Sequence, residues 1–378
     1  MILIPGRAEE FQNGAWWSKF RKESKKNAYF QSHCKLYAFI YDSRNEVSEQ
    51  SDDFTKDFMA IFSPENISES DSTTSHLPKK PILIGYSLGG IIARTAMEDD
   101  AVYDRVEKVI AIAVPFHGSP IFDPDWFTQF LAPGLRSPIR ALWDRAIYRF
   151  YLFDKSNLRR GLSWDNFDHS KPQFKQHIVK GDLVLPSMEV YREPETTPRF
   201  KEKLLVYASY LPNHSTEEAD KISLLEAPIK LVEDTRKLPK AVVGSFIPFY
   251  GFSVHAVFDY TNLQLNNIPT YTPDSPEGKV INLYRYNDGV IPLSSMLFLP
   301  ARKTPYSEDL EGLLKAVDVP KVRLFYNLNH MHIGDYIPPL LTPKKINTQD
   351  MCHPTEGKRT PNQWLLHDLK NYLKTGRF

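Results

Sequence analysis

The chain has little cysteine, with two in 378 residues, at Cys34 and Cys352. Two cysteines are too few for a disulfide framework, and one bridge or two thiols are equally compatible with the sequence. Long hydrophobic runs are also missing, since no apolar stretch approaches the ~18 residues of a membrane-spanning helix. The first six residues, MILIPG, lack the basic and apolar regions of a signal peptide and are typical of a core strand. We therefore expect a soluble protein, cytoplasmic as the chain stands; whether residues precede Met1 stays open.

An excess of charge of one sign is absent too. The 47 Lys and Arg residues against 46 Asp and Glu give a net charge of +1, which removes the electrostatic case for nucleic acid as a partner. A charged share of 25% and a hydrophobic share of 42% are those of an ordinary globular protein. Aromatic residues are plentiful at 13%, which is typical of apolar pockets or lids. The length suits one large α/β domain with insertions, or two ordinary domains.

The chemically most informative stretch is residues 81–94, PILIGYSLGGIIAR. A short apolar run, typical of a buried strand, leads into G-x-S-x-G, and a helix-like run follows. This strand–turn–helix context predicts a nucleophile elbow with Ser87 at the turn. Gly85 and Gly89 fit a turn that brings strand and helix close together. Ser87 then lies at a helix N-terminus, where backbone N–H groups stabilise developing negative charge.

Apolar runs that read as strands alternate with helix-like stretches, which predicts βαβ units and a mostly parallel central sheet flanked by helices. The predicted strands, beside the one that precedes Ser87, are Ile2–Ile4, Leu36–Tyr41, Val109–Val114, Leu204–Tyr210, Val280–Tyr286 and Val322–Tyr326. Residues 120–200 interrupt this alternation with many aromatic residues and predict an inserted helical cap or lid. Residues 1–119 and 201–378 then form the core, with a second excursion at about 211–278. An amphipathic helix over Trp364–Leu373 is expected to cover the sheet edge.

An acid and a base follow the serine in the order that a Ser–Asp–His triad takes in α/β-hydrolases. Asp288 and His330 each come in a turn directly after a predicted strand. The carboxyl ends of parallel strands share one edge of a sheet, so the three side chains are expected near one another. Nucleophilic acyl transfer needs these roles: a base to take the serine proton and an acid to orient that base.

The segments GYSLGG (85–90), NDGVIPLSS (287–295) and NHMH (329–332) make the sequence resemble the α/β-hydrolase superfamily and, within it, bacterial triacylglycerol lipases and esterases. The resemblance implies an α/β-hydrolase fold, with Ser87 as nucleophile, Asp288 as acid and His330 as base. It also implies an oxyanion hole made by the backbone N–H groups of Arg7 and Leu88. No cofactor is implied. The match covers the core elements and says little about either insertion.

The sequence departs from this family at three places. Pro5-Gly6 stands where the family has His-Gly before the oxyanion residue. His117 comes one position late for the family's Pro-His-x-Gly-Ser segment, and we interpret it as a structural histidine. His332 occupies the position of a calcium-binding Asp, which leaves calcium binding open.

His332 is also the alternative base, because residues two apart in an extended chain point the same way. Metal binding by His330 with His332 lacks a Cys or a third His nearby, so no metal site is predicted.

The function that follows from these residues is a serine carboxylic-ester hydrolase, lipase- or esterase-like, that works through an acyl-enzyme. An apolar acyl substrate, either a small molecule or a lipid ester, fits the aromatic cap, and transient contact of the cap with a lipid surface is compatible with it. An acyltransferase, thioesterase or amidase would use the same triad. A non-catalytic binding module on a hydrolase fold is the alternative of another class. Acyl-chain length and oligomeric state are not given by the sequence.

Overall fold

The structure is a computed structural model. It describes residues 1–6, 15–42, 45–62, 80–119, 162, 177–179, 182–184, 197–211, 262, 265, 270–271, 285–299, 310–333 and 360–378.

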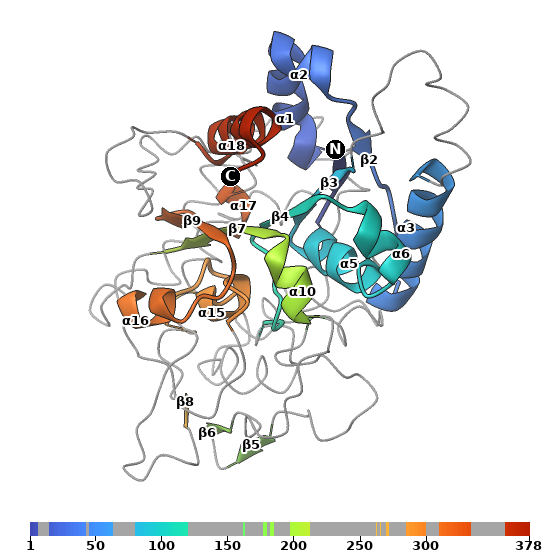
Figure 1. Cartoon of the computed structure of the whole chain (residues 1–378). Helices are drawn as coiled ribbons and strands as arrows, with labels where there is room; N and C mark the ends of the chain where they lie inside the picture. Colours follow the sequence, from blue (N-terminus) through green and yellow to red (C-terminus); the bar gives the residue numbers. More distant parts are fainter. Residues whose placement is uncertain are drawn as a thin grey trace, which may run out of the picture.

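A six-stranded sheet forms the centre of the molecule (Figure 1), in the order β2-β1-β3-β4-β7-β9. Its strands are β1 (Ile2–Ile4), β2 (Tyr37–Ala38), β3 (Ile82–Tyr86), β4 (Lys108–Ile112), β7 (Leu204–Tyr210) and β9 (Lys321–Tyr326). Every neighbouring pair is parallel. All residues of β1, β3 and β7 are buried, because a parallel sheet is covered on both faces. The predicted α/β fold with a mostly parallel sheet is therefore confirmed.

Helices connect the strands and cover the sheet. In chain order they are α1 (Ala15–Lys26), α2 (Ala28–His33), α3 (Val47–Phe62), α5 (Leu88–Ala96), α6 (Asp100–Arg105), α10 (Thr197–Glu202), α15 (Leu293–Met296), α16 (Leu310–Lys315), α17 (His330–Ile333) and α18 (Pro361–Thr375). Helix α5 packs against β1, β3 and β4, and α3 packs against α5. Helices α1 and α18 contact each other on another part of the molecule (Figure 1).

The strand order reverses between β1 and β3. The chain passes from β1 to β2 on one side and then returns to place β3 on the other side of β1. A crevice opens at such a switch point, beyond the carboxyl ends of the strands, and in open α/β sheets ligands bind there. The ends of β1 and β3 carry Pro5, Gly6 and Ser87. The topology therefore places the predicted nucleophile where a substrate would bind.

Helix α18 contains the predicted amphipathic segment and is well defined at both ends. Thr360 and Gln363 form a capping box, and Pro361 occupies the first turn, where a missing N–H costs nothing. Gly376 ends the helix in the left-handed region with φ 71°. Arg323 and Tyr207 bind Asp368 on the buried side, so α18 lies against β7 and the edge strand β9. The expectation that this helix covers the sheet edge is confirmed.

Two short strands, β5 (His177–Val179) and β6 (Asp182–Val184), form an antiparallel pair within the segment predicted as a cap. Strand β8 (Thr270–Tyr271), from the second excursion, pairs parallel with β6. The two inserted segments thus share a small sheet. The predicted cap helices, the cap's aromatic residues and most of the second excursion lie outside the described residues, and the domain boundaries stay predictions.

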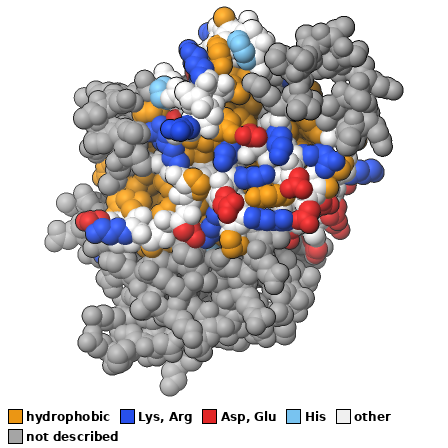
Figure 2. Space-filling view, viewed as in Figure 1, with side chains coloured by type: hydrophobic (Ala, Val, Ile, Leu, Met, Phe, Trp, Pro, Cys, Tyr) orange, Lys and Arg blue, Asp and Glu red, His pale blue; other side chains and the backbone are white. Residues whose placement is uncertain are grey.

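Charges of both signs alternate over the described surface on the side shown in Figure 2, in keeping with the net charge of +1. Within the described ranges, the structure contains no helix long and apolar enough to cross a membrane.

Candidate active site

Ser87 occupies a strained turn between β3 and α5. Its φ of 49° and ψ of −123° lie outside the regions that side-chain-bearing residues normally adopt. Two backbone hydrogen bonds hold the turn, from Ser87 N to the Ile112 carbonyl at 2.9 Å and from Gly90 N to the Ser87 carbonyl at 3.0 Å. A conformation of this kind persists only where its surroundings determine it. This turn is the predicted nucleophile elbow.

The glycines around Ser87 make the elbow sterically feasible. A Cβ on Gly85 would lie 2.6 Å from the Gly90 Cα, so strand and helix touch there through their backbones. A Cβ on Gly89 would overlap the carbonyl oxygens of Ile4 and Pro5. Helix α5 therefore starts in direct contact with the end of β1, which agrees with the close packing expected from the sequence.

The structure brings Ser87, His330 and Asp288 together. His330 Nε2 lies 3.0 Å from Ser87 Oγ, and His330 Nδ1 lies 2.7 Å from Asp288 Oδ2. Asp288 is fully buried and His330 is 7% exposed. These distances are those of a nucleophile, a base and a group that orients the base. Of the two candidate bases, His330 is the one whose ring lies between Ser87 and Asp288. The His332 side chain lies outside the described residues.

Backbone contacts fix the Asp288 carboxylate. Its Oδ1 accepts hydrogen bonds from the N–H groups of Val290 at 2.9 Å and Ile291 at 2.7 Å, which leaves Oδ2 for His330. The His330 N–H also donates to the Asp288 carbonyl at 3.0 Å. The NDG turn predicted after residue 286 therefore binds both the ring and the backbone of the histidine. Of the strand predicted just before it, residues 280–284 lie outside the described residues.

The predicted oxyanion hole is described in part. Leu88 is the first residue of α5, where backbone N–H groups lack partners within the helix. Arg7 lies outside the described residues. The segment before it is ordered by Tyr41, whose hydroxyl donates to the Pro5 carbonyl at 2.6 Å. A Cβ on Gly6 would lie 3.3 Å from the Ser87 Cβ, so the chain leaving β1 passes directly beside the nucleophile.

His117 is buried away from the triad. Its Nε2 lies 2.7 Å from the Leu299 carbonyl oxygen, and its backbone N–H donates to Ser295 Oγ at 3.0 Å. Burial, together with the nearby charges of Lys201 and Arg94, lowers its pKa from 6.5 to about 3, against the opposing effect of the Leu299 hydrogen bond. His117 is thus a neutral structural histidine, as interpreted from the sequence.

The remaining sites considered from the sequence are a metal centre and a disulfide bridge. Among the residues that the structure describes, no group of three or more His, Cys, Asp or Glu side chains could hold a metal ion. Cys352 lies outside those residues, so both possibilities for Cys34 and Cys352, one bridge or two thiols, stay open as the sequence left them.

Sequence reasoning missed Tyr86, which lies beside both Ser87 and His330. Its hydroxyl donates to the His330 carbonyl oxygen at 2.5 Å. The alternation of side chains along the strand predicts that the residue next to Gly85 faces the side of the sheet opposite to α5. The contact of Tyr86 with His330 could not be predicted, because the acceptor is a backbone carbonyl oxygen 244 residues away in the sequence.

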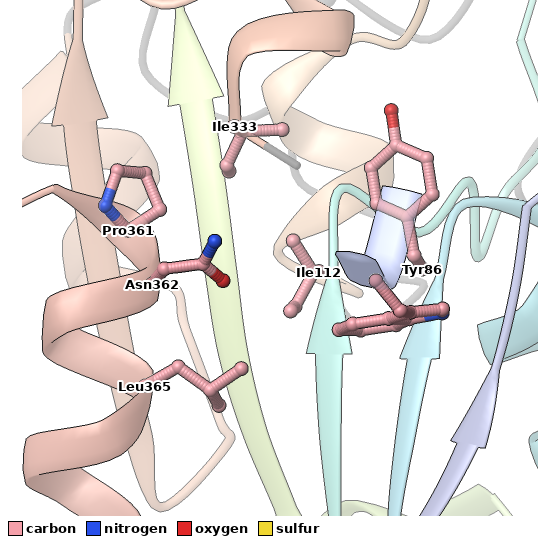
Figure 3. Close-up of a pocket in the computed structure, with 7 residues that line it drawn as sticks. Tyr86, Ile112, Ile333, Pro361, Asn362 and Leu365 are labelled. Atoms are coloured by element: carbon pink, nitrogen blue, oxygen red, sulfur yellow. The ribbon is translucent and has the colours of Figure 1, made fainter. Parts of the chain in front are cut away.

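A small pocket lies on that opposite side of the sheet (Figure 3). Residues from α1, β3, β4, α17 and α18 line it: Trp17, Tyr86, Ile112, Ile333, Pro361, Asn362 and Leu365. The pocket is mainly apolar and lies beneath the short helix that His330 begins.

Comparison with known proteins gives a family match over part of the chain. Residues 27–134 match a family described as PGAP1-like alpha/beta domain. This range includes Ser87 and ends before Asp288 and His330. No curated protein matches the sequence.

Solved structures similar to this chain include two lipases and a protein named EstA. Lipase 1 from Pelosinus fermentans is 12% identical, with a TM-score of 0.43, over 90% of this chain and 94% of its own. Mature Bacillus licheniformis lipase BlEst2 is 14% identical, with a TM-score of 0.37, over 87% and 83%. EstA from Clostridium botulinum is 13% identical, with a TM-score of 0.39, over 88% and 82%. The family match is consistent with the predicted resemblance to α/β-hydrolases. The sequence identities and TM-scores of the solved structures carry no information about the substrate.

Proposed function

We propose that this protein is a serine hydrolase that cleaves carboxylic esters through an acyl-enzyme. The observation that carries the proposal is the continuous chain of short contacts from Ser87 Oγ through the His330 ring to Asp288 Oδ2. A strained serine at the switch point of a parallel sheet, joined to a buried His–Asp pair, supports nucleophilic acyl transfer.

The proposed reaction begins when His330 Nε2 takes the Ser87 proton as Oγ attacks the ester carbonyl carbon. The tetrahedral oxyanion accepts hydrogen bonds from the backbone N–H groups of Leu88 and Arg7. His330 then gives its proton to the departing alkoxide, and the ester becomes an alcohol and an acyl-Ser87. Water, activated by His330, attacks the acyl group and releases the carboxylic acid and free Ser87.

Asp288 supports the histidine without exchanging a proton with it. Its Oδ2 accepts from His330 Nδ1–H, so Nε2 is left as the acceptor that faces Ser87. The carboxylate also stabilises the imidazolium that forms when the serine proton is taken. The two backbone N–H donors on Oδ1 keep it from rotating away.

The substrate that we propose is an ester with an apolar acyl group, in a small molecule or a lipid. The support is the aromatic-rich sequence of residues 120–200, which predicts an inserted cap whose side chains could line an apolar substrate pocket. Transient contact of this segment with a lipid surface remains part of the proposal.

The test is ester turnover by the full chain and by single variants of the triad. Wild type is assayed on nitrophenyl esters of increasing acyl length, beside Ser87→Ala, Asp288→Asn and His330→Ala. We expect each variant to lose about 10³-fold or more in kcat, because the three groups act as one unit. Ser32→Ala and His33→Gln, two exposed positions on α2, serve as matched controls and should retain wild-type turnover.

Turnover by Ser87→Ala equal to wild type would overturn the proposal. Adding alcohol acceptors distinguishes hydrolysis from acyl transfer, because a transferase would form a new ester in preference to the free acid. Thioester and amide analogues test the remaining chemistry of the same triad. A folded wild type that is inert towards all of these would favour the binding module.

A further inference from the structure

We propose that Tyr86 is a positioning residue that ties the catalytic histidine to the nucleophile elbow, an inference that rests on the proposed function. Its hydroxyl holds the backbone of His330, while its own backbone leads directly into Ser87. One side chain thereby fixes the distance between the elements that carry base and nucleophile.

The side-chain alternation of β3 determines where Tyr86 lies. Gly85 faces α5, since a Cβ there would meet the Gly90 backbone. Its neighbour Tyr86 therefore faces the other side of the sheet, next to Ile112 of β4, with which it is paired in register. From this position the ring extends past the end of β3 and reaches α17 (Figure 3).

The backbone of His330 is held from two directions. Its N–H donates to the Asp288 carbonyl at 3.0 Å, and its carbonyl oxygen accepts from the Tyr86 hydroxyl at 2.5 Å. The two rings also lie close, with centroids 5.4 Å apart and planes inclined by 31°. Apart from the Ser87–His330 contact itself, the Tyr86 hydrogen bond is a direct link from the elbow strand to the histidine. It persists in every protonation state of the imidazole.

Tyr86 also contacts the segment that leads to the predicted oxyanion hole. A Cβ on Gly6 would lie 2.7 Å from Tyr86 Cδ1, so the chain leaving β1 passes close to one side of the ring. The tyrosine is 3% exposed. Its side chain therefore contacts both the backbone at Gly6, through the ring, and the backbone at His330, through the hydroxyl.

The Tyr86 ring lies among mainly apolar side chains, so the loss of its hydrogen bond to the His330 carbonyl oxygen should be costly. The pocket that it lines is formed mainly by Trp17, Ile112, Ile333 and Leu365, whose side chains are apolar over most of their surface. Removing the hydroxyl withdraws a buried donor from the His330 carbonyl, and a buried acceptor that loses its donor is destabilising. The histidine segment would relax, and Nε2 would leave its position 3.0 Å from Ser87 Oγ.

The experiment compares Tyr86→Phe with Tyr103→Phe in the full chain. Tyr103 lies on α6, and its hydroxyl also donates to a backbone carbonyl, that of Arg199, at 3.0 Å, remote from the triad. We expect Tyr86→Phe to lower kcat by about 10-fold with KM within about twofold, because misplacing a catalytic group by a fraction of an ångström affects the chemical step. Fluorophosphonate labelling of Ser87 should slow by the same factor. Tyr103→Phe should change neither rate.

Replacing Tyr86 by 4-aminophenylalanine returns an N–H donor to the ring and should restore most of the lost kcat. A role in packing alone predicts no such recovery, because the phenyl ring is present in all three proteins. A folded Tyr86→Phe protein with wild-type kcat and labelling rate would overturn the inference. So would a rate loss that the amino group does not recover.

A second readout is independent of turnover. The His330 Nδ1 proton, bound to Asp288 Oδ2 at 2.7 Å, should give a downfield proton resonance that His330→Ala removes. We expect this resonance to broaden or shift in Tyr86→Phe and to stay unchanged in Tyr103→Phe. If wild type shows no esterase activity and no labelling, the proposed function fails while the resonance still tests Tyr86. An unchanged resonance in Tyr86→Phe would refute the positioning role whatever the activity.

Discussion

The position of Ser87 depends on the glycines beside it, which allow β3, α5 and the end of β1 to approach closely. A side chain at φ 49° costs energy, and the elbow stores that strain where β3, α5 and the end of β1 meet. Gly85, Gly89 and Gly90 remove the side chains that would separate these backbones. In this conformation Ser87 Oγ lies 3.0 Å from His330 Nε2.

The Gly89 contact gives a test of this packing. In Gly89→Ala the new methyl would overlap the carbonyl oxygens of Ile4 and Pro5, which are backbone atoms and cannot rotate away. We expect a loss of about 1–3 kcal/mol in the free energy of unfolding, typical of overpacking, with a loss of Ser87 labelling. Urea denaturation and probe labelling measure the two effects.

The control is Gly376→Ala, where nothing lies within 4 Å of the added Cβ and only the left-handed φ of 71° opposes it. That variant should lose about 1 kcal/mol of stability and label like wild type. Wild-type stability and labelling in Gly89→Ala would contradict the account of the elbow.

His117 contributes to the pH dependence of stability. Burial lowers its pKa to about 3 in the folded protein, against 6.5 in the unfolded chain. Between these values the unfolded state binds a proton that the folded state does not, so stability is present above about pH 6.5 and is lost as the pH falls. We expect His117→Gln to show a smaller decrease in unfolding free energy than wild type between pH 7 and pH 4.

Urea titrations at several pH values test this expectation, with the exposed His33→Gln as the control. His33→Gln should show the same pH dependence as wild type. If the unfolding free energy of His117→Gln and of wild type falls equally between pH 7 and pH 4, then His117 is not the group that causes the loss of stability.

The triad could be predicted from the sequence because each member sits in a local pattern. Ser87 follows a buried strand, and both Asp288 and His330 occur in turns with a characteristic spacing. Tyr86 and Ser295 could not be found in this way. Their partners, the His330 carbonyl oxygen and the His117 backbone N–H, are distant backbone atoms that no side-chain pattern reports.

Helix α18 is fastened to the sheet by a buried polar group rather than by apolar contact alone. Arg323 of β9 donates to both oxygens of Asp368, at 2.9 Å through Nε and 2.6 Å through Nη2. The Tyr207 hydroxyl donates to the same carboxylate at 2.6 Å, and the Trp364 ring lies 4.0 Å from the guanidinium carbon. Strand β9 also leads to His330, so this attachment supports the strand that presents the base.

Breaking this ion pair should be costly, because it leaves a buried charge without its partner. Arg323 is 2% exposed and Asp368 is 1% exposed. We expect Asp368→Ala to lose about 3–5 kcal/mol in the free energy of unfolding, and Arg323→Met with Asp368→Leu to recover much of that loss. Denaturant unfolding measures both, with Asn371→Ala, at an exposed position on α18, as the control. A single variant as stable as wild type would contradict this role.

The same pair has a pH signature. Burial alone would raise the pKa of Asp368, yet the hydrogen bonds from Arg323 and Tyr207 outweigh it and hold the pKa below the usual 3.8. A carboxyl group whose pKa is lowered by folding stabilises the folded state at pH values above its pKa in the unfolded chain. This stabilisation is lost as the pH falls through its pKa in the folded protein. The stability difference between wild type and Asp368→Asn should therefore narrow below about pH 4.

Elements were predictable from the sequence where their pattern was local. Strands β1, β7 and β9 fall at the predicted apolar runs, and α18 falls at its amphipathic run. The pairing of β6 with β8, between two insertions, was not predictable, because strands of two or three residues carry almost no pattern and these two lie far apart in the sequence.

At the scale of the whole molecule, the strand order of the sheet switches between β1 and β3, and Ser87 lies at that switch point. Ser87 and His330 are 243 residues apart in the sequence and follow the parallel strands β3 and β9, and Asp288 reaches His330 from the turn after residue 286. Charge is spread in both signs over the surface in Figure 2, so no single-sign field marks a polyanionic ligand there. The central claim is thus that this edge of the sheet contains a reactive serine.

Labelling by a fluorophosphonate tests that claim most directly. Full-length wild type, Ser87→Ala and His330→Ala are incubated with the probe and examined by intact mass and peptide mapping. The account predicts a single adduct on the Ser87 peptide in wild type, none in Ser87→Ala, and labelling slowed by about 100-fold or more in His330→Ala. An unlabelled wild type, or an adduct that persists in Ser87→Ala, would contradict it.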